Sequence, residues 1–209
     1  MGIGNKRGIE LFEESGALLK GHFSLRNQRD ALIYIAKDLL CKNNSKALEE
    51  ICLGIAQDFV LYSIGTVVGL ESGAVKYARL AAESLSRLTD AKVVSVSARK
   101  TVDGKFYIDE KDLKHVKGKR VLVIEDVITT GKSVSEVIAL LRSLDALVNW
   151  VGGVWNRGGV TAQKLKIGVL ISQINEQYPT YQPGENCPGC KAKIPYDLKF
   201  GHGKHLGEN

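Results

Sequence analysis

The chain has 209 residues, of which 44% are hydrophobic and 25% charged, and its 29 lysines and arginines outnumber 23 aspartates and glutamates, for a net charge of +6. This composition is typical of an ordinary globular protein with one large domain, or one domain and a small appendage. Four cysteines are too few for a secreted disulfide scaffold, and no apolar run approaches the roughly 20 residues of a membrane span. The N-terminal residues lack the apolar stretch of a signal peptide, so we expect a cytoplasmic protein without a membrane partner.

The positive excess is mild and spread along the chain. The densest basic stretch, Lys111 to Arg120, is interrupted by Asp112, and no block of five or six like charges occurs. Nucleic-acid binding would need basic residues on one face, with aromatic residues for stacking on bases. We therefore do not expect nucleic acid as a partner, and a small phosphorylated substrate fits the charge equally well.

Strand-like runs and helical patterns alternate along the chain. This succession implies right-handed crossovers and an α/β fold, with a mainly parallel central sheet flanked by helices. Helical spacing of apolar residues predicts helices over 9–19, 45–60, 74–88 and 133–143. Short apolar runs predict strands over 23–25, 33–35, 64–68, 93–96, 121–124, 146–154 and 167–171, with 106–108 folded back as a hairpin arm.

Composition changes clearly near one end of the chain only. From Tyr178 onward the sequence holds all four prolines, two of the four cysteines and two of the four histidines. We therefore divide the chain into a core, residues 1–177, and a short Pro/Cys/His-containing tail, residues 178–209.

The segment 121–133 carries the clearest chemical signal. Its apolar strand leads into two carboxylates, Glu125 and Asp126, at the strand edge where open α/β sheets bind ligands. The chain then turns through 129–131 and enters a helix near Ser133. Small residues, hydroxyl groups and a helix N-terminus all favour a bound anion. The pattern predicts a phosphate site beside carboxylates suited to sugar hydroxyls or hydrated Mg²⁺.

Two other interpretations of this segment are weaker. Gly131-Lys132-Ser133 matches the last three positions of the P-loop of nucleoside triphosphatases, but that motif requires a glycine where Asp126 stands. A buried strand with incidental acids would bury two carboxylates at a cost and without a purpose.

The whole pattern, four apolar residues, two acids and an apolar-apolar-Thr-Thr-Gly-x-Ser turn, resembles the phosphoribosyl pyrophosphate (PRPP) motif of type I phosphoribosyltransferases. The residues Glu-Asp-Val-Ile-Thr-Thr-Gly-Lys-Ser of this motif are most similar to those of orotate phosphoribosyltransferases. Gly21–Leu25 resembles that family's hood, and Val68–Ala74 resembles its pyrophosphate loop. Arg99-Lys100 resembles the start of its catalytic loop, and Val154–Arg157 resembles its orotate-contacting segment. Cys187–Cys190 resembles a cysteine pair of some bacterial members.

The resemblance implies a type I phosphoribosyltransferase fold, with an N-terminal hood inside the core and a short C-terminal tail. It implies transfer of the phosphoribosyl group of PRPP to orotate, giving orotidine 5′-monophosphate and pyrophosphate in pyrimidine biosynthesis, with Mg²⁺. It also implies a homodimer in which the catalytic loop is shared across the interface.

Roles follow residue by residue from the same resemblance. Glu125, Asp126 and Lys100 are implied as catalytic, with Mg²⁺ held through PRPP near the two carboxylates. Thr129 and Arg157 are implied as orotate contacts. The implied PRPP contacts are Arg26, Glu71, Ser72, Gly73, Arg99, Lys100, Lys105, Glu125, Asp126, Val127, Ile128, Thr129, Thr130, Gly131, Lys132 and Ser133.

Departures from the family pattern leave the acceptor base open. Asn27–Ala31 replaces a Ser-Gly-x-x-Ser stretch of the hood, and the pyrophosphate loop lacks a lysine. Val102–Lys105 replaces a Lys-x-His of the catalytic loop, and Asn156 stands where an aspartate is common. The alternatives are a phosphoribosyltransferase for another nucleobase, or a PRPP-binding regulator of the same fold.

The remaining cysteines and histidines raise the question of zinc. Cys187, Cys190, His202 and His205 supply four potential ligands, but two residues between the histidines is tighter than the usual three to five. That spacing favours a Pro/Gly-rich knuckle with reduced thiols over a zinc site. His22 is expected in a loop, without a partner visible in the sequence.

Overall fold

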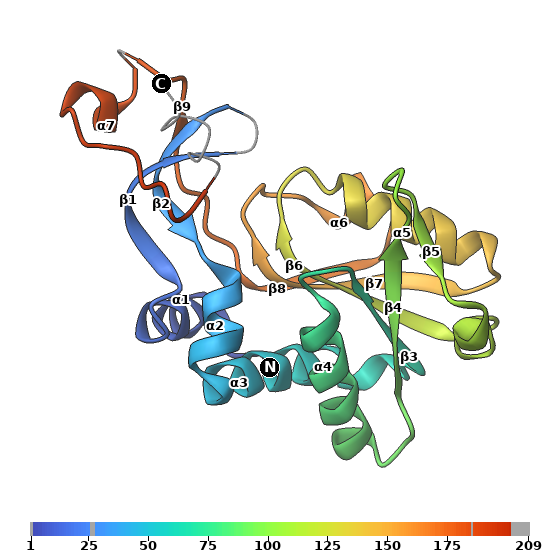
Figure 1. The fold of residues 1–209 in the computed structure, drawn as a ribbon. Coiled ribbons are helices and arrows are strands. Elements are labelled where there is room, and N and C mark those ends of the chain that lie inside the picture. Colours follow the sequence, from blue (N-terminus) through green and yellow to red (C-terminus); the bar gives the residue numbers. More distant parts are fainter. Residues whose placement is uncertain (1, 26–27, 185, 202–209) are drawn as a thin grey trace. The chain divides into compact units, whose positions relative to one another are not determined.

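The computed structural model describes residues 2–25, 28–184 and 186–201 (Figure 1). They belong to two compact units, the first within residues 1–8 and 46–176 and the second within residues 9–45 and 177–209. The sequence-based division assigned the N-terminal hood to the core. In the structure, residues 9–45 share a unit with the tail instead.

The first unit is built around a six-stranded sheet. Four neighbouring pairs of strands are parallel, and one short edge strand returns antiparallel as the expected hairpin arm. The sheet confirms the predicted α/β architecture with a mainly parallel sheet. Its order is β5 (Phe106–Ile108), β4 (Val94–Lys100), β3 (Thr66–Leu70), β6 (Arg120–Ile128), β7 (Leu147–Asn156) and β8 (Val169–Ile174).

Helices cover the faces of this sheet. The residues of β6 from Val121 to Ile124 are fully buried, as expected for a strand covered on both sides. Gly69 of β3 lies against Ala78, where an added Cβ would come within 2.7 Å of the alanine Cβ, so strand and helix pack closely. The helical elements are α3 (Ser45–Phe59), η1 (Val60–Tyr62), α4 (Val75–Thr89), η2 (Glu110–His115), α5 (Lys132–Ser143) and α6 (Ala162–Leu165).

The second unit joins the two ends of the chain in one small sheet. Strands β1 (Leu18–Ser24) and β2 (Asp30–Ile35) form an antiparallel hairpin, and β9 (Thr180–Tyr181) pairs with the start of β2. The guanidinium group of Arg29 strengthens this pairing by donating to the hydroxyl and carbonyl oxygens of Thr180, at 2.9 and 2.6 Å. The unit also holds α2 (Lys37–Asn43) and α7 (Pro188–Lys191).

The first helix ends earlier than predicted. A helix was expected over 9–19, but α1 spans Gly4–Glu14 and the chain enters β1 at Leu18. Gly16 adopts the left-handed conformation, with φ of +63°, and its N–H donates to Glu13 while that of Ala17 donates to Phe12. This pair of bonds is the Schellman motif that terminates helices.

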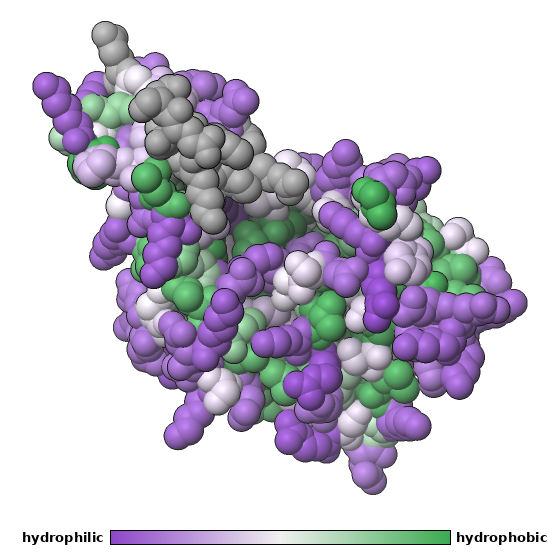
Figure 2. Space-filling model, viewed as in Figure 1, coloured by the Kyte–Doolittle hydropathy of each residue, from purple (hydrophilic) through white to green (hydrophobic). Residues whose placement is uncertain are grey.

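Other boundaries agree with the sequence to within five residues. The elements that the sequence did not predict are α2, η1, η2, α6, α7 and β9, which have two to seven residues and so carry too little periodicity to recognise. No helix within the described ranges is long and apolar enough to cross a membrane. Hydrophilic residues predominate on the face drawn in Figure 2, with hydrophobic residues scattered among them.

Candidate active site

The order of the strands locates a crevice between β3 and β6. From β3 the chain crosses to β4 on one side, and from β6 it crosses to β7 on the other side. Right-handed crossovers in opposite directions place α4 and α5 on opposite faces of the sheet. The carboxyl ends of β3 and β6 therefore flank a topological switch point, where open α/β sheets bind ligands.

The predicted phosphate site forms a small pocket at the end of β6. It is lined by Glu125, Val127, Ile128, Thr129, Thr130, Gly131, Lys132, Ser133 and Val134. Gly131, with φ of +78°, precedes the first turn of α5, and an added Cβ would lie 3.1 Å from Val160 and Leu165. The pocket thus meets the positive end of the α5 dipole, which stabilises bound anions.

The two adjacent carboxylates have different surroundings. The sequence placed them after the strand, but β6 continues through both, and successive residues of a strand face opposite sides. Glu125 is half-buried and lines the phosphate pocket, whereas Asp126 is 3% exposed and does not line it. An oxygen of Asp126 accepts from the N–H of Val127 at 2.6 Å, which fixes the backbone entering the pocket.

The segment expected to hold pyrophosphate follows β3, at the same edge of the sheet. Glu71 and Ser72 are exposed and Gly73 is half-buried. The Glu71 N–H donates to the carbonyl of Ala98 at 2.9 Å, and its carboxylate accepts from the N–H of Lys100 at 3.0 Å. These bonds join the loop after β3 to the end of β4, so two predicted pyrophosphate-binding segments lie together.

The three basic residues expected in the catalytic loop lie on the exposed β4–β5 hairpin. Arg99 pairs with Asp109 at 3.3 Å, and Lys105 pairs with Asp103 at the same distance. The ammonium group of Lys100 lies 4.7 Å from the ring centre of Phe106. These partners hold the cations on one hairpin, at the end of β4.

Within this hairpin, a hydrogen bond from Thr101 and a second from Lys105 lower the pKa of Asp103. Both hydrogen bonds favour the charged carboxylate of Asp103. The turn also contains Gly104, with φ of +82°, as the Asp-Gly signal in the sequence predicted.

The loop after β7 packs directly on the phosphate pocket. The N–H of Gly158 donates to the carbonyl of Ile128 at 3.0 Å, and a Cβ at Gly158 would lie 1.6 Å from the carbonyl oxygen of Thr129. This close approach brings the backbone at Arg157 next to Thr129, the two residues predicted to contact orotate. The sequence analysis missed Gly158, although the pair Gly158-Gly159 after a strand is a signal for such an approach.

The departure at Asn156 has a structural explanation. Its side chain is buried, donates to the carbonyl of Val160 at 2.8 Å and accepts from the N–H of Val160 at 3.0 Å. An aspartate could accept but not donate here, because an ionised carboxylate has no proton. Asn156 therefore closes the loop that follows β7 and does not face a substrate.

Some predicted residues cannot be placed in this description. Arg26, His202 and His205 lie outside the described residues.

Lys132 lies at the pocket, and its ammonium group is 3.9 Å from Glu136, one turn further along α5.

Comparison with known proteins identifies the fold. Residues 42–183 match the model of the phosphoribosyl transferase domain. The chain belongs to the phosphoribosyltransferase family. A relative from Chlorobium phaeobacteroides named orotate phosphoribosyltransferase is 34% identical over 193 residues, covering 90% of this chain and 92% of the relative. The resemblance drawn from the motifs is thereby confirmed.

Solved structures agree at the level of the fold. The orotate phosphoribosyltransferase of Aeropyrum pernix superposes with a TM-score of 0.60 at 24% identity, over 79% of this chain and 91% of that one. The Mycobacterium tuberculosis enzyme in complex with PRPP superposes with a TM-score of 0.59 at 22% identity, over 80% and 95% of the two chains. The predicted type I phosphoribosyltransferase fold is confirmed.

Proposed function

We propose that this protein is an orotate phosphoribosyltransferase, which converts orotate and PRPP into orotidine 5′-monophosphate and pyrophosphate in pyrimidine biosynthesis. The observation that carries the proposal is the phosphate pocket at the switch point, with Glu125 in its lining and the N-terminus of α5 at its base. Relatives of nearly the same length and of that name support the choice of base.

The 5′-phosphate of PRPP would bind in the pocket, at residues 129–133. The backbone N–H groups of a helix N-terminus and the hydroxyls of Thr129, Thr130 and Ser133 are donors suited to a phosphate. This placement puts the ribose ring beside Glu125, because that carboxylate lines the same pocket.

The reaction breaks the bond between C1′ and pyrophosphate, so positive charge develops on the ribose. A carboxylate beside the ring stabilises this charge in the transition state more than in the ground state, which is the requirement for electrostatic catalysis. We assign this role to Glu125, with Asp126 fixing the backbone on which the pocket depends.

The departing pyrophosphate would lie between the loop after β3 and the β4–β5 hairpin. Backbone donors of 71–73 and the cations of Arg99, Lys100 and Lys105 would offset its charge. Lys105 and Asp103 are both exposed, and the exposed Arg99 pairs with a half-buried Asp109; ion pairs in contact with water contribute little to stability. Binding can therefore exchange those carboxylates for phosphate oxygens at small cost.

Orotate would be held between Thr129 and Arg157. The guanidinium group forms two parallel hydrogen bonds to a carboxylate, and orotate carries a carboxylate that other common bases lack. The Gly158 contact supports this assignment, because it fixes the backbone of the two residues side by side.

Mg²⁺ fits the donors present at this site. Glu125, which lines the pocket, offers hard carboxylate oxygens, and Mg²⁺ is usually bound through one or two carboxylates together with substrate phosphates. When bound with PRPP, it supplies positive charge that neutralises the pyrophosphate. We propose that Glu125 holds it through water and substrate, whereas the buried Asp126 does not contact it.

We also propose a homodimer in which each β4–β5 hairpin serves the neighbouring subunit. Val102, at the tip of this hairpin, is a fully exposed apolar side chain. A loop that reaches into a partner's site would bury it. A cytoplasmic location fits such a metabolic enzyme.

The test is an assay of purified protein with PRPP, Mg²⁺ and a panel of nucleobases. Consumption of orotate alone supports the proposal, whereas turnover of another base overturns it in favour of a different acceptor. PRPP binding without any turnover would instead favour a regulator of the same fold. In the matched variant Arg157→Lys, we expect KM for orotate to rise about tenfold, with KM for PRPP nearly unchanged.

A further inference from the structure

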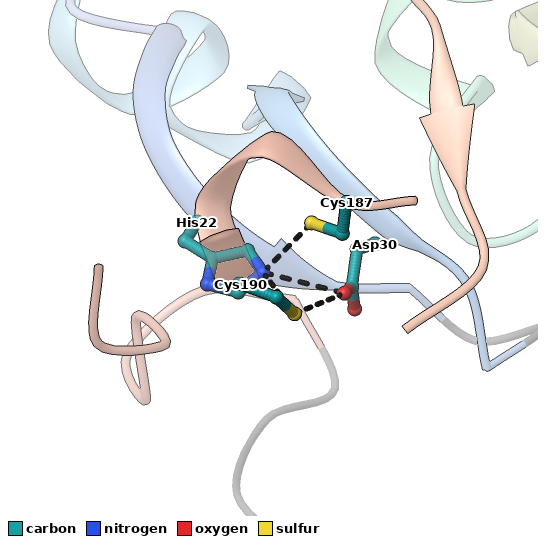
Figure 3. A group of neighbouring side chains, drawn as sticks. All are labelled: His22, Asp30, Cys187 and Cys190. Carbon is teal, nitrogen blue, oxygen red and sulfur yellow. Dashed lines mark hydrogen bonds and ion pairs between the residues drawn. The ribbon is translucent and has the colours of Figure 1, made fainter. Parts of the chain in front are cut away.

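Four potential metal ligands converge in the second unit, and none of them is among the residues assigned to the reaction. His22 comes from β1, Asp30 is the first residue of β2, and Cys187 and Cys190 come from the tail (Figure 3). One ligand atom from each lies within 4.8 Å of all the others. His22 and Cys190 are 168 positions apart in the chain, so only folding brings the group together.

Four of the six distances between these atoms match a tetrahedral site, and all six are within 4.8 Å. His22 Nε2 lies 3.3 Å from Cys187 Sγ, 3.8 Å from Cys190 Sγ and 3.3 Å from Asp30 Oδ2. Asp30 Oδ2 is also 3.3 Å from Cys190 Sγ. Zinc bonds of about 2.0–2.3 Å at tetrahedral angles place pairs of ligand atoms about 3.3–3.8 Å apart. A zinc ion would need little movement of these side chains.

A second layer of contacts holds the ligand atoms in position. His22 Nδ1 lies 2.8 Å from the carbonyl oxygen of Ile194, so this nitrogen carries the proton and Nε2 has a lone pair directed at the group. The Tyr196 hydroxyl donates to both oxygens of Asp30, at 3.0 and 3.1 Å, and its ring stacks on His22 with centres 3.9 Å apart. The N–H of Gly184 donates to Cys190 Sγ at 3.4 Å.

The turn between the cysteines is shaped to meet the imidazole. Two residues separate Cys187 from Cys190, the spacing of a zinc knuckle. Gly189 lies against His22, and an added Cβ would come within 2.7 Å of the ring. The side chains of His22 and Asp30 are each only 1% exposed, and Cys187 is fully buried. Cys190 is half-buried. Four protein ligands would leave no open coordination position for a substrate.

We propose that His22, Asp30, Cys187 and Cys190 bind a structural zinc ion that fastens the tail to the β1–β2 hairpin. Two thiolates and an imidazole favour zinc over Mg²⁺, which prefers oxygen ligands. Four protein ligands and burial indicate a structural site. The set keeps the two cysteines of the sequence-based hypothesis and replaces its two histidines. It goes beyond the proposed function, because no ligand of the ion takes part in the transfer reaction.

The first experiment measures metal content by mass spectrometry in tag-free protein purified from zinc-supplemented cells under reducing conditions. We expect about one zinc ion per chain, and at least a tenfold loss of zinc in Cys190→Ser and His22→Gln. Cys41→Ser is the matched control, since Cys41 is a free thiol in α2 outside the group, and it should keep the metal. Zinc far below stoichiometric in the wild type, or full zinc in both ligand variants, overturns the proposal.

A second pair of measurements separates the alternatives without replacing any of the four proposed ligands. Replacing zinc by Co²⁺ in the wild-type chain should give the thiolate charge-transfer band and the intense visible bands of tetrahedral coordination; their absence contradicts the site. The double variant His202→Gln/His205→Gln should bind zinc like the wild type. Loss of the metal there would overturn this ligand set in favour of the histidines near the end of the tail.

Discussion

The phosphate pocket and the His22–Cys190 group (His22, Asp30, Cys187 and Cys190) are two polar sites that differ in how the chain forms them. The pocket comes from one run of residues, 125–134, has exposed threonines in its lining and offers the N-terminus of a helix. The group is made of side chains from both ends of the chain, of which His22, Asp30 and Cys187 are buried and Cys190 is half-buried. An open site can bind and release an anion in each turnover, whereas a closed set of four ligands retains an ion. The first should govern rate and the second stability.

The largest effect is expected from Glu125→Gln, which should lower the rate without lowering stability. The change is nearly isosteric and keeps an oxygen to accept from the N–H of Asp126, but it removes the negative charge that lines the pocket beside the reacting ribose, so we expect kcat to fall by about 100-fold or more. The melting temperature should stay close to that of the wild type. Steady-state kinetics and calorimetry measure the two quantities; a wild-type rate would refute the role of Glu125. Glu83→Gln, an exposed change on α4, serves as the control.

Removal of zinc should produce the converse result, in which stability falls. Binding at a free zinc concentration about 100 times Kd contributes about 2.7 kcal/mol. In a chain of this size that corresponds to a fall in Tm of roughly 5–10 °C. Thermal unfolding with a chelator, followed by added Zn²⁺, should show the fall and its reversal. An unchanged Tm after verified metal removal contradicts a structural role.

Gly158→Ala should show whether the close contact between Gly158 and Thr129 positions the pocket. The added methyl group would overlap the carbonyl oxygen of Thr129, so the backbone at the phosphate and orotate sites must shift. We expect kcat/KM to fall about tenfold, since small displacements of positioning groups are costly. Gly65→Ala is the matched control, because the nearest atom to a Cβ there is 4.0 Å away and φ is not positive. Equal kinetics for both variants would exclude the contact as a positioning device.

The smallest effect is expected from a surface ion pair that belongs to neither site. A hydrogen bond from Arg7 lowers the pKa of Glu50, burial opposes this shift, and the charge of Arg7 adds to it. Because the pKa is lower in the folded state, the stabilisation is present above the ordinary value near 4.5 and is lost as pH falls through the folded value.

Both side chains of this pair are more than a third exposed, so Glu50→Gln should lower the free energy of unfolding by only about 0.5 kcal/mol at neutral pH. At acid pH the two proteins should have the same stability. Urea unfolding at the two pH values measures the difference, and a pH-independent difference would contradict its electrostatic origin.

Local features were predictable to different degrees. The strand, turn and helix start at 121–133 were recognised because consecutive residues carry the whole pattern. The end of α1 was wrong by several residues, because the apolar spacing continues past Gly16 while the backbone turns there. His22 was expected in a loop, yet it is buried in β1, since a strand that alternates imperfectly gives no clear signal for its inward face.

The sequence by itself determined the alternation of strands and helices, the strand, turn and helix start at 121–133, and the family, because runs of consecutive residues carry these patterns. The tertiary structure decided which distant residues meet. It placed Gly158 against Thr129, gave Asn156 a partner in its own loop, and joined His22 and Asp30 to the cysteine pair of the tail. Such contacts depend on how the sheets are assembled and how the loops between their strands are folded. Residue types and their spacing along the chain do not specify that arrangement.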